Sequence, residues 1–143
     1  MKLFFIIERA SMLITSGTEQ DPTRKHFFTA LTNPWDYGGE NRLIMVSLSS
    51  VKNHRFDETC IIRPEDNAHE FIRVDSFVDY SKARLQETAS IDRGISSGEI
   101  VEQGTIDADC FERMKIGLKA SPRTPQYIQK AYDDYMLRHD AAR

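Results

Sequence analysis

The sequence predicts an α+β fold in which a small, curled antiparallel β-sheet or barrel comes first and helices follow. Short runs of β-branched and aromatic residues fill the first two thirds of the chain, and Gly, Pro and Asn separate them, which is typical of meandering strands. After Gly104 the apolar residues recur at spacings of three and four, the period of a helix with one buried face. Strands first and helices last is the order expected of an α+β domain.

Five segments are predicted to be strands because each is a short apolar run bounded by residues that favour turns. These strands cover residues 11–15, 26–32, 42–48, 59–63 and 76–80, and the turns lie at 16–17, 33–34, 38–39 and 64–67. The short connections favour a meandering antiparallel sheet over alternating β–α–β units.

Two helices are predicted in the last third of the chain. Apolar side chains recur at helical spacing in residues 107–119, and Gly117 is expected to weaken the end of that helix. A second helix is expected over residues 124–140, with Thr124 as its cap and Pro125 at its first position. The apolar stripes are Cys110, Phe111, Met114 and Leu118 in the first helix, and Ile128, Ala131, Tyr132, Tyr135 and Met136 in the second. Tyr127, Tyr132 and Tyr135 either pack on the sheet or form a surface for a partner.

Composition predicts a single domain over residues 1–143. With 40% apolar and 10% aromatic residues, this length buries a core without disulfides or a metal. The net charge is −3, so any binding of phosphate must come from a local patch. Cys60 and Cys110 stand in apolar surroundings and are expected to be buried thiols of a reduced, cytoplasmic protein. The apolar run at residues 3–7 is too short for a signal peptide or a membrane span, and no other segment approaches the length of a span.

Two clusters of polar residues are candidates for chemistry. Glu19, Arg24, Lys25 and His26 lie within eight residues, where the guanidinium suits a phosphate and the carboxylate or imidazole could move a proton. The second cluster follows the strand that ends near residue 48 and consists of Ser49, Ser50, Lys52, His54 and Arg55. Hydroxyls beside basic side chains suit a phosphate seat. An exposed charged turn and a serine-rich strand end are the alternative interpretations.

The sequence gives little support for a metal site, a cofactor site or a serine-hydrolase site. The four histidines lack metal-ligand spacing with each other or with the cysteines, so no metal is assigned. Asp66 and His69 could meet across a turn, although such pairs are mostly loop hydrogen bonds. No Gly-rich phosphate loop precedes a helix, so no cofactor is expected, and no Gly-x-Ser-x-Gly elbow occurs.

The order of these motifs resembles the MazF/PemK family of toxin endoribonucleases. The family's loop with Arg five residues after Glu matches Gly17-Thr18-Glu19-Gln20 leading to Arg24. A short polar turn matches residues 32–33, a Thr-Ser-like pair matches Ser49-Ser50, and an Asp-Ser step matches Asp75-Ser76. The family's C-terminal helix corresponds loosely to residues 104–118. The resemblance covers residues 11–121, and the helix over residues 124–140 is additional. The chain departs from the pattern in placing Lys25-His26 after Arg24, where the family has Pro, and in having Ser49 for Thr.

This resemblance implies a small SH3-like antiparallel barrel with C-terminal helices that works as a homodimer and is the toxin of a type II toxin–antitoxin system. It implies metal-independent cleavage of single-stranded RNA, with Arg24 stabilising the scissile phosphate, Ser49 positioning it, and Glu19 or His26 assisting proton transfer. Lys25, Ser50, Lys52, His54 and Arg55 are then expected to contact the RNA. An acidic antitoxin is the implied partner. Two alternatives stay open: a barrel that binds RNA or a protein without catalysis, and a small hydrolase that uses carboxylates and His69.

Overall fold

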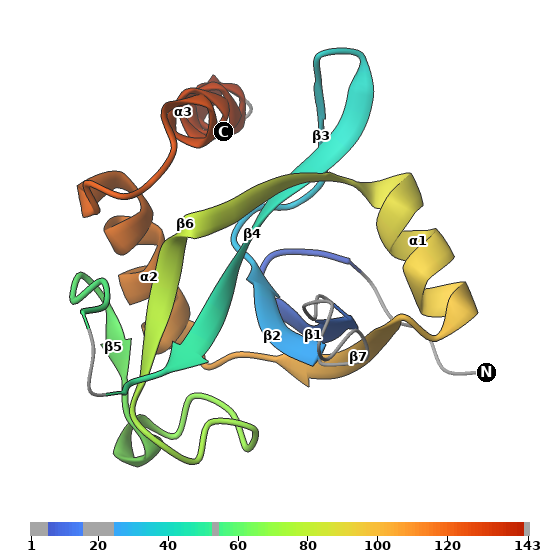
Figure 1. The fold of residues 1–143 in the computed structure, drawn as a ribbon. Coiled ribbons are helices and arrows are strands. Elements are labelled where there is room, and N and C mark those ends of the chain that lie inside the picture. Colours follow the sequence, from blue (N-terminus) through green and yellow to red (C-terminus); the bar gives the residue numbers. More distant parts are fainter. Residues whose placement is uncertain (1–5, 16–24, 53–54, 142–143) are drawn as a thin grey trace.

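The computed structural model describes residues 6–15, 25–52 and 55–141. In these residues a curled antiparallel sheet forms a half-barrel flanked by helices (Figure 1), which confirms the predicted α+β class. The strands are β1 (Ala10–Thr15), β2 (Lys25–Ala30), β3 (Trp35–Tyr37), β4 (Glu40–Ser50), β5 (Ile61–Ile62), β6 (Ser76–Glu87) and β7 (Ile100–Thr105). The helices are α1 (Thr88–Ser97), α2 (Ala108–Ala120) and α3 (Gln126–Ala141), and the short 3-10 helix η1 (Pro64–Asp66) follows β5.

The long strands β4 and β6 hold the sheet together. Within the described ranges the strand order is β5-β6-β4-β2-β1-β7, and β3 forms a hairpin with the start of β4. Every pair is antiparallel. The register between β4 and β6 shifts once, between Met45 opposite Arg84 and Ser47 opposite Asp79. Because such an irregularity bends a strand, β6 can run from β5 near α2 across to α1 (Figure 1).

The predicted strands and helices are present, with boundaries that differ by a few residues except at β6. That strand continues from the predicted end near residue 80 to Glu87. The predicted turn at Gly38-Gly39 joins β3 to β4, and both glycines have positive φ angles of 68° and 86°. A two-residue hairpin turn of this kind favours glycine at both positions.

Three elements are missing from the sequence-based prediction: β3, α1 and β7. The helix α1 has the sequence Thr-Ala-Ser-Ile-Asp-Arg-Gly-Ile-Ser-Ser and fully buries only Ile91 and Gly94. In β7, the edge strand beside β1, only Ile100 is buried. In α1 the apolar residues Ile91 and Ile95 are four residues apart, but the helix is short and contains Thr, Ser, Asp and Gly, which have low helix propensity. In β7 the two apolar residues, Ile100 and Val101, are adjacent, so the segment shows no alternation.

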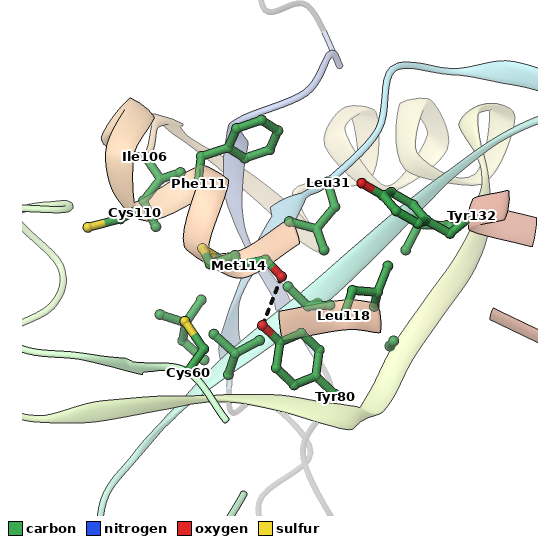
Figure 2. Close-up of a cluster of buried hydrophobic side chains, with 14 of the residues drawn as sticks. Leu31, Cys60, Tyr80, Ile106, Cys110, Phe111, Met114, Leu118 and Tyr132 are labelled. Carbon is green, nitrogen blue, oxygen red and sulfur yellow. Dashed lines mark hydrogen bonds between the residues drawn. The ribbon is translucent and has the colours of Figure 1, made fainter. Parts of the chain in front are cut away.

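The sheet has a hydrophobic core on each face. The larger one, the α2/α3 core, packs β2, β4 and β6 against α2 and α3, and Figure 2 shows its centre. There the buried hydroxyl of Tyr80 donates a hydrogen bond of 2.8 Å to the carbonyl of Met114. The smaller one, the α1 core, lies between the sheet and α1. It contains Ala10, Met12, Ile14, Phe28, Ala30, Leu43, Met45, Ile91 and Ile100.

Gly117, expected to weaken the end of the first helix, lies within α2, which continues to Ala120, and it is buried under Tyr80. One detail of the predicted helices is wrong. The hydroxyl of Thr124, expected to cap α3, donates to the carbonyl of Leu118 in α2 at 2.8 Å. The buried stripe of α3 is confirmed at four positions, with Tyr132 and Tyr135 packed in the α2/α3 core, whereas Met136 and Tyr127 are exposed.

Both cysteines are free and buried, as predicted. Among the described residues, no helix combines the length and the apolar character that crossing a membrane requires.

Candidate functional site

A pocket of about 440 Å³ opens where β2 begins, β4 ends and β6 begins. The ladder explains why these ends meet, since Phe27 pairs with Leu48 and Ser49 pairs with Phe77. The residues that line the pocket are Lys25, His26, Phe27, Leu48, Ser49, Ser50, Lys52, Phe71, Phe77, Asp79 and Lys82. We call it the strand-end pocket.

The strand-end pocket combines positive charge with hydroxyl groups. Lys25, Lys52 and Lys82 are exposed at its wall. The Nζ atom of Lys25 lies 3.4 Å from the carbonyl oxygen of Gly98, to which it donates. Ser50 is exposed, Ser49 is half-buried, and both line the pocket. Ammonium and hydroxyl groups in one concavity suit phosphate oxygens, because both donate hydrogen bonds to anions.

Asp79 is the one carboxylate among the described residues that line this pocket. Its Oδ1 atom accepts a hydrogen bond of 2.6 Å from the hydroxyl of Ser81, and its Oδ2 atom lies 3.8 Å from Nζ of Lys82. The negative charge of Asp79 is therefore already engaged by neighbours, and the balance of charge in the pocket remains positive.

An unsatisfied hydroxyl lies on the same strand as Ser49. The side chain of Ser47 is buried and faces the same side of β4 as that of Ser49, two residues on. Among the described residues its Oγ atom has no hydrogen-bond partner. A buried polar group without a partner is uncommon and costs about 1–3 kcal/mol.

Aromatic side chains also line the pocket, namely those of Phe27, Phe71 and Phe77. Phe71 stacks on the buried ring of Phe27 with a centroid distance of 5.2 Å and an interplanar angle of 11°. Phe77 packs against Phe56 at 5.2 Å. A smaller apolar pocket of about 110 Å³ continues past Phe71 towards Arg73 and Val74. The pocket thus offers aromatic surface beside its cationic groups.

The structure brings five of the predicted site residues together in the strand-end pocket: Lys25, His26, Ser49, Ser50 and Lys52. Arg55 is exposed and does not line the pocket. Glu19, Arg24 and His54 lie outside the described residues.

Sequence reasoning missed Phe71, Phe77, Asp79 and Lys82. Phe77 and Asp79 alternate along β6 towards the side that Ser49 faces, because Ser49 is paired with Phe77. That alternation is visible in the sequence, but the pairing that carries it to Ser49 is not. Phe71 lies in the loop between η1 and β6, where no helix or strand periodicity indicates which way a side chain faces.

The cysteines and the Asp66 and His69 side chains give no support for a second site. Burial raises the pKa of the Cys60 thiol, and it raises the pKa of Cys110 to about 11, so neither is a ready nucleophile. Asp66 and His69 have different partners: Asp66 accepts from the backbone N–H of Arg63, and His69 contacts the carbonyl of Gln103. In the part of the chain that the structure describes, no three His, Cys, Asp or Glu side chains are grouped to hold a metal ion.

Comparison of the chain with protein-family models, with curated proteins and with solved structures finds no match to any of them.

Proposed function

We propose that this protein is a metal-independent endoribonuclease that cleaves single-stranded RNA, and that it acts as a toxin of the MazF/PemK kind on an SH3-like barrel. The observation that carries the proposal is the strand-end pocket, in which Ser49 and Ser50 lie with Lys25, Lys52 and His26. These residues come from the two clusters that the sequence singled out for phosphate binding.

The chemistry that fits these residues is attack by the 2′-hydroxyl of RNA on the adjacent phosphorus. The 2′-oxygen forms a bond to phosphorus, the bond to the 5′-oxygen breaks, and a 2′,3′-cyclic phosphate remains. One group accepts the proton of the 2′-hydroxyl and another donates a proton to the leaving oxygen, roles for Glu19 and His26. Arg24 stabilises the additional negative charge that develops on phosphorus oxygens, and Ser49 orients the phosphate.

The lysines then hold the rest of the RNA strand. Lys25, Lys52 and Lys82 are exposed at the pocket wall and neutralise phosphates on either side of the scissile one. An acidic, partly disordered antitoxin would occupy the same positive surface and fold as it binds. A homodimer belongs to this proposal through the resemblance of the sequence alone.

Cleavage of RNA in EDTA by the purified protein tests the proposal, with expression expected to arrest growth. Arg24→Ala and Ser49→Ala should each lower the cleavage rate by about 10²–10³-fold, since each removes a group aimed at the reacting phosphate. Ser49→Thr keeps the hydroxyl and should retain most of the rate.

Arg138→Ala is the matched control, because it removes an exposed guanidinium on α3 that does not line the pocket. Its cleavage rate should equal that of the wild type. An unchanged rate in Arg24→Ala, or no cleavage of any single-stranded RNA by the wild type, would contradict the nuclease.

A second candidate function is RNA binding without cleavage. It is favoured by Asp79, the one described carboxylate of the pocket, which Ser81 and Lys82 already engage. In that case Arg24→Ala would weaken binding in a salt-dependent way, and no RNA would be cut by any variant.

A further inference from the structure

The loop between η1 and β6 presents an aromatic ring that the proposed chemistry at phosphorus does not use. Phe71 is 47% exposed, although most of the large aromatic side chains that the structure describes are buried. It lies on the wall shared by the strand-end pocket and the smaller apolar pocket. One face of its ring rests on Phe27, which is 2% exposed.

Contacts of the backbone of Phe71 and of its neighbours His69 and Ile72 hold the loop that carries the ring. The backbone N–H of Phe71 donates a hydrogen bond of 3.0 Å to Nδ1 of His69. Because Nδ1 accepts this bond, Nε2 of the neutral imidazole carries the proton and donates to the carbonyl of Gln103 in β7. The imidazole also packs edge-on against Phe27 at 4.9 Å. The next residue, Ile72, is buried in the α2/α3 core.

An ordered aromatic ring beside lysines has the features of a base-binding site for single-stranded nucleic acid. Bases stack on aromatic faces, while cationic groups nearby follow the phosphates. At this site Lys25, Lys52 and Lys82 share the pocket with Phe71. The ring is held before any ligand arrives, so binding would require little additional ordering.

We propose that Phe71 is a stacking platform for one base of a single-stranded RNA whose phosphates lie along Lys25, Lys52 and Lys82. This inference rests on the proposed function and specifies how the same site holds its substrate. The ring of Phe27 packs against the other face of Phe71. His69 is a positioning residue, because its Nδ1 atom accepts the hydrogen bond from the backbone N–H of Phe71. The base stacks on the exposed face of Phe71, and from that point the RNA backbone continues into the strand-end pocket.

Binding of an uncleavable oligonucleotide tests the platform separately from catalysis. The probe is a fluorescein-labelled oligouridylate of about 12 nucleotides with 2′-O-methyl groups, which lacks the nucleophile for cleavage. Fluorescence anisotropy gives its dissociation constant as a function of salt concentration. Phe71→Ala should raise the dissociation constant at least about 5-fold, the loss expected from one base stack.

The salt dependence distinguishes stacking from contact with phosphate. Phe71→Ala should leave the slope of log K against log salt unchanged, whereas Lys52→Ala should make it shallower by about 0.7. Phe71→Trp should bind at least as well as the wild type, and its added tryptophan fluorescence should be quenched by the probe. Tyr127→Ala is the matched control, because Tyr127 is a 57% exposed aromatic on α3 and does not line either pocket.

A probe series with single abasic positions completes the test. The wild type should lose affinity when the stacked base is missing, and Phe71→Ala should show no such loss. If the wild type binds with salt dependence but Phe71→Ala binds equally well, the platform is wrong while the proposed function stands. If the wild type binds and Phe71→Ala is impaired as expected, yet cleavable RNA stays intact, the nuclease is wrong and the platform stands. If the wild type binds no single strand, both are wrong.

Discussion

At the scale of single residues, Gly117 illustrates how a close contact reverses an ordinary helix preference. Glycine inside a helix costs about 1 kcal/mol relative to alanine, yet α2 has Gly117 three residues before Ala120, its last residue. A Cβ atom at this position would lie 2.0 Å from Oη of Tyr80 and 2.7 Å from its Cζ atom. The side chain of Tyr80 is buried in the α2/α3 core and cannot move aside freely. The absence of a side chain at Gly117 is therefore what allows α2 to approach β6.

We expect Gly117→Ala to lower the free energy of unfolding by about 1–3 kcal/mol, the usual cost of overpacking a core, instead of raising it. Urea denaturation measures this change. Ile116→Ala is the control, because Ile116 is a neighbour on the same helix and is 69% exposed. An increase in stability in Gly117→Ala would show that Tyr80 can shift without cost.

At the scale of elements, a buried hydrogen bond joins the segment before β5 to the turn between α2 and α3. The hydroxyl of Ser121 donates to Oδ2 of Asp57 at 2.6 Å, and the N–H of Thr59 donates to Oδ1 at 3.0 Å. Burial by itself would raise the pKa of Asp57, but these hydrogen bonds and the charge of Arg123 outweigh it and hold the pKa below its ordinary value of 3.8. The ionised carboxylate is therefore the form that stabilises this junction.

Because the folded pKa of Asp57 is depressed, its contribution is complete above pH 3.8 and disappears as the pH falls through the lower folded value. Asp57→Asn should cost about 1.5–3 kcal/mol of stability at pH 7, the range for hydrogen bonds to charged groups. The difference from wild type should shrink below pH 3.8. Urea denaturation at several pH values measures it.

Asp133→Asn is the control for this experiment. Asp133 forms an exposed ion pair of 2.7 Å with Lys119, and such pairs contribute about 0–1 kcal/mol. A difference between Asp57→Asn and wild type that stays constant down to the most acidic condition would contradict the ionised form of Asp57 as the stabilising one.

At the scale of the whole molecule, one sheet supports two cores, since β2 and β4 contribute side chains to both. Phe27 and Leu48 belong to the α2/α3 core, and Phe28 and Met45 belong to the α1 core. Neighbouring residues of one strand point to opposite faces, so loss of either core removes the support of the same strands. The two cores are therefore expected to unfold together.

Ile91→Ala in α1 and Ile128→Ala in α3 test this coupling, because both side chains are fully buried in different cores. Each should lower stability by about 2–5 kcal/mol while far-UV and near-UV circular dichroism continue to report one transition. Leu137→Ala, at a position that is 71% exposed, should change stability by less than about 0.5 kcal/mol. Two separate transitions in Ile91→Ala would mean that the α1 core unfolds independently.

The sequence by itself determined the class of fold, most strands, both terminal helices and the chemical character of the candidate site. The spacing of apolar residues and the turn residues are local features of the sequence. They were therefore sufficient to predict β1, β2 and β4 and the apolar stripes of α2 and α3. The Thr, Ser, Asp and Gly residues of α1 and the lack of alternation in β7 left both elements unpredicted. Ser49 and Lys25 could be named as candidates because hydroxyl and ammonium groups have known chemistry wherever they lie.

Only the tertiary structure decided which groups share a pocket. The antiparallel register of β4 with β2 and β6 places Ser49 beside Phe77 and brings Lys25 to the same opening, over separations in sequence that no local pattern spans. The packing of Ile72 and the hydrogen bond from Phe71 to His69 bring an unremarkable loop to that opening. Such long-range contacts depend on the burial of two cores at once, and that burial is a property of the folded chain and of no single segment.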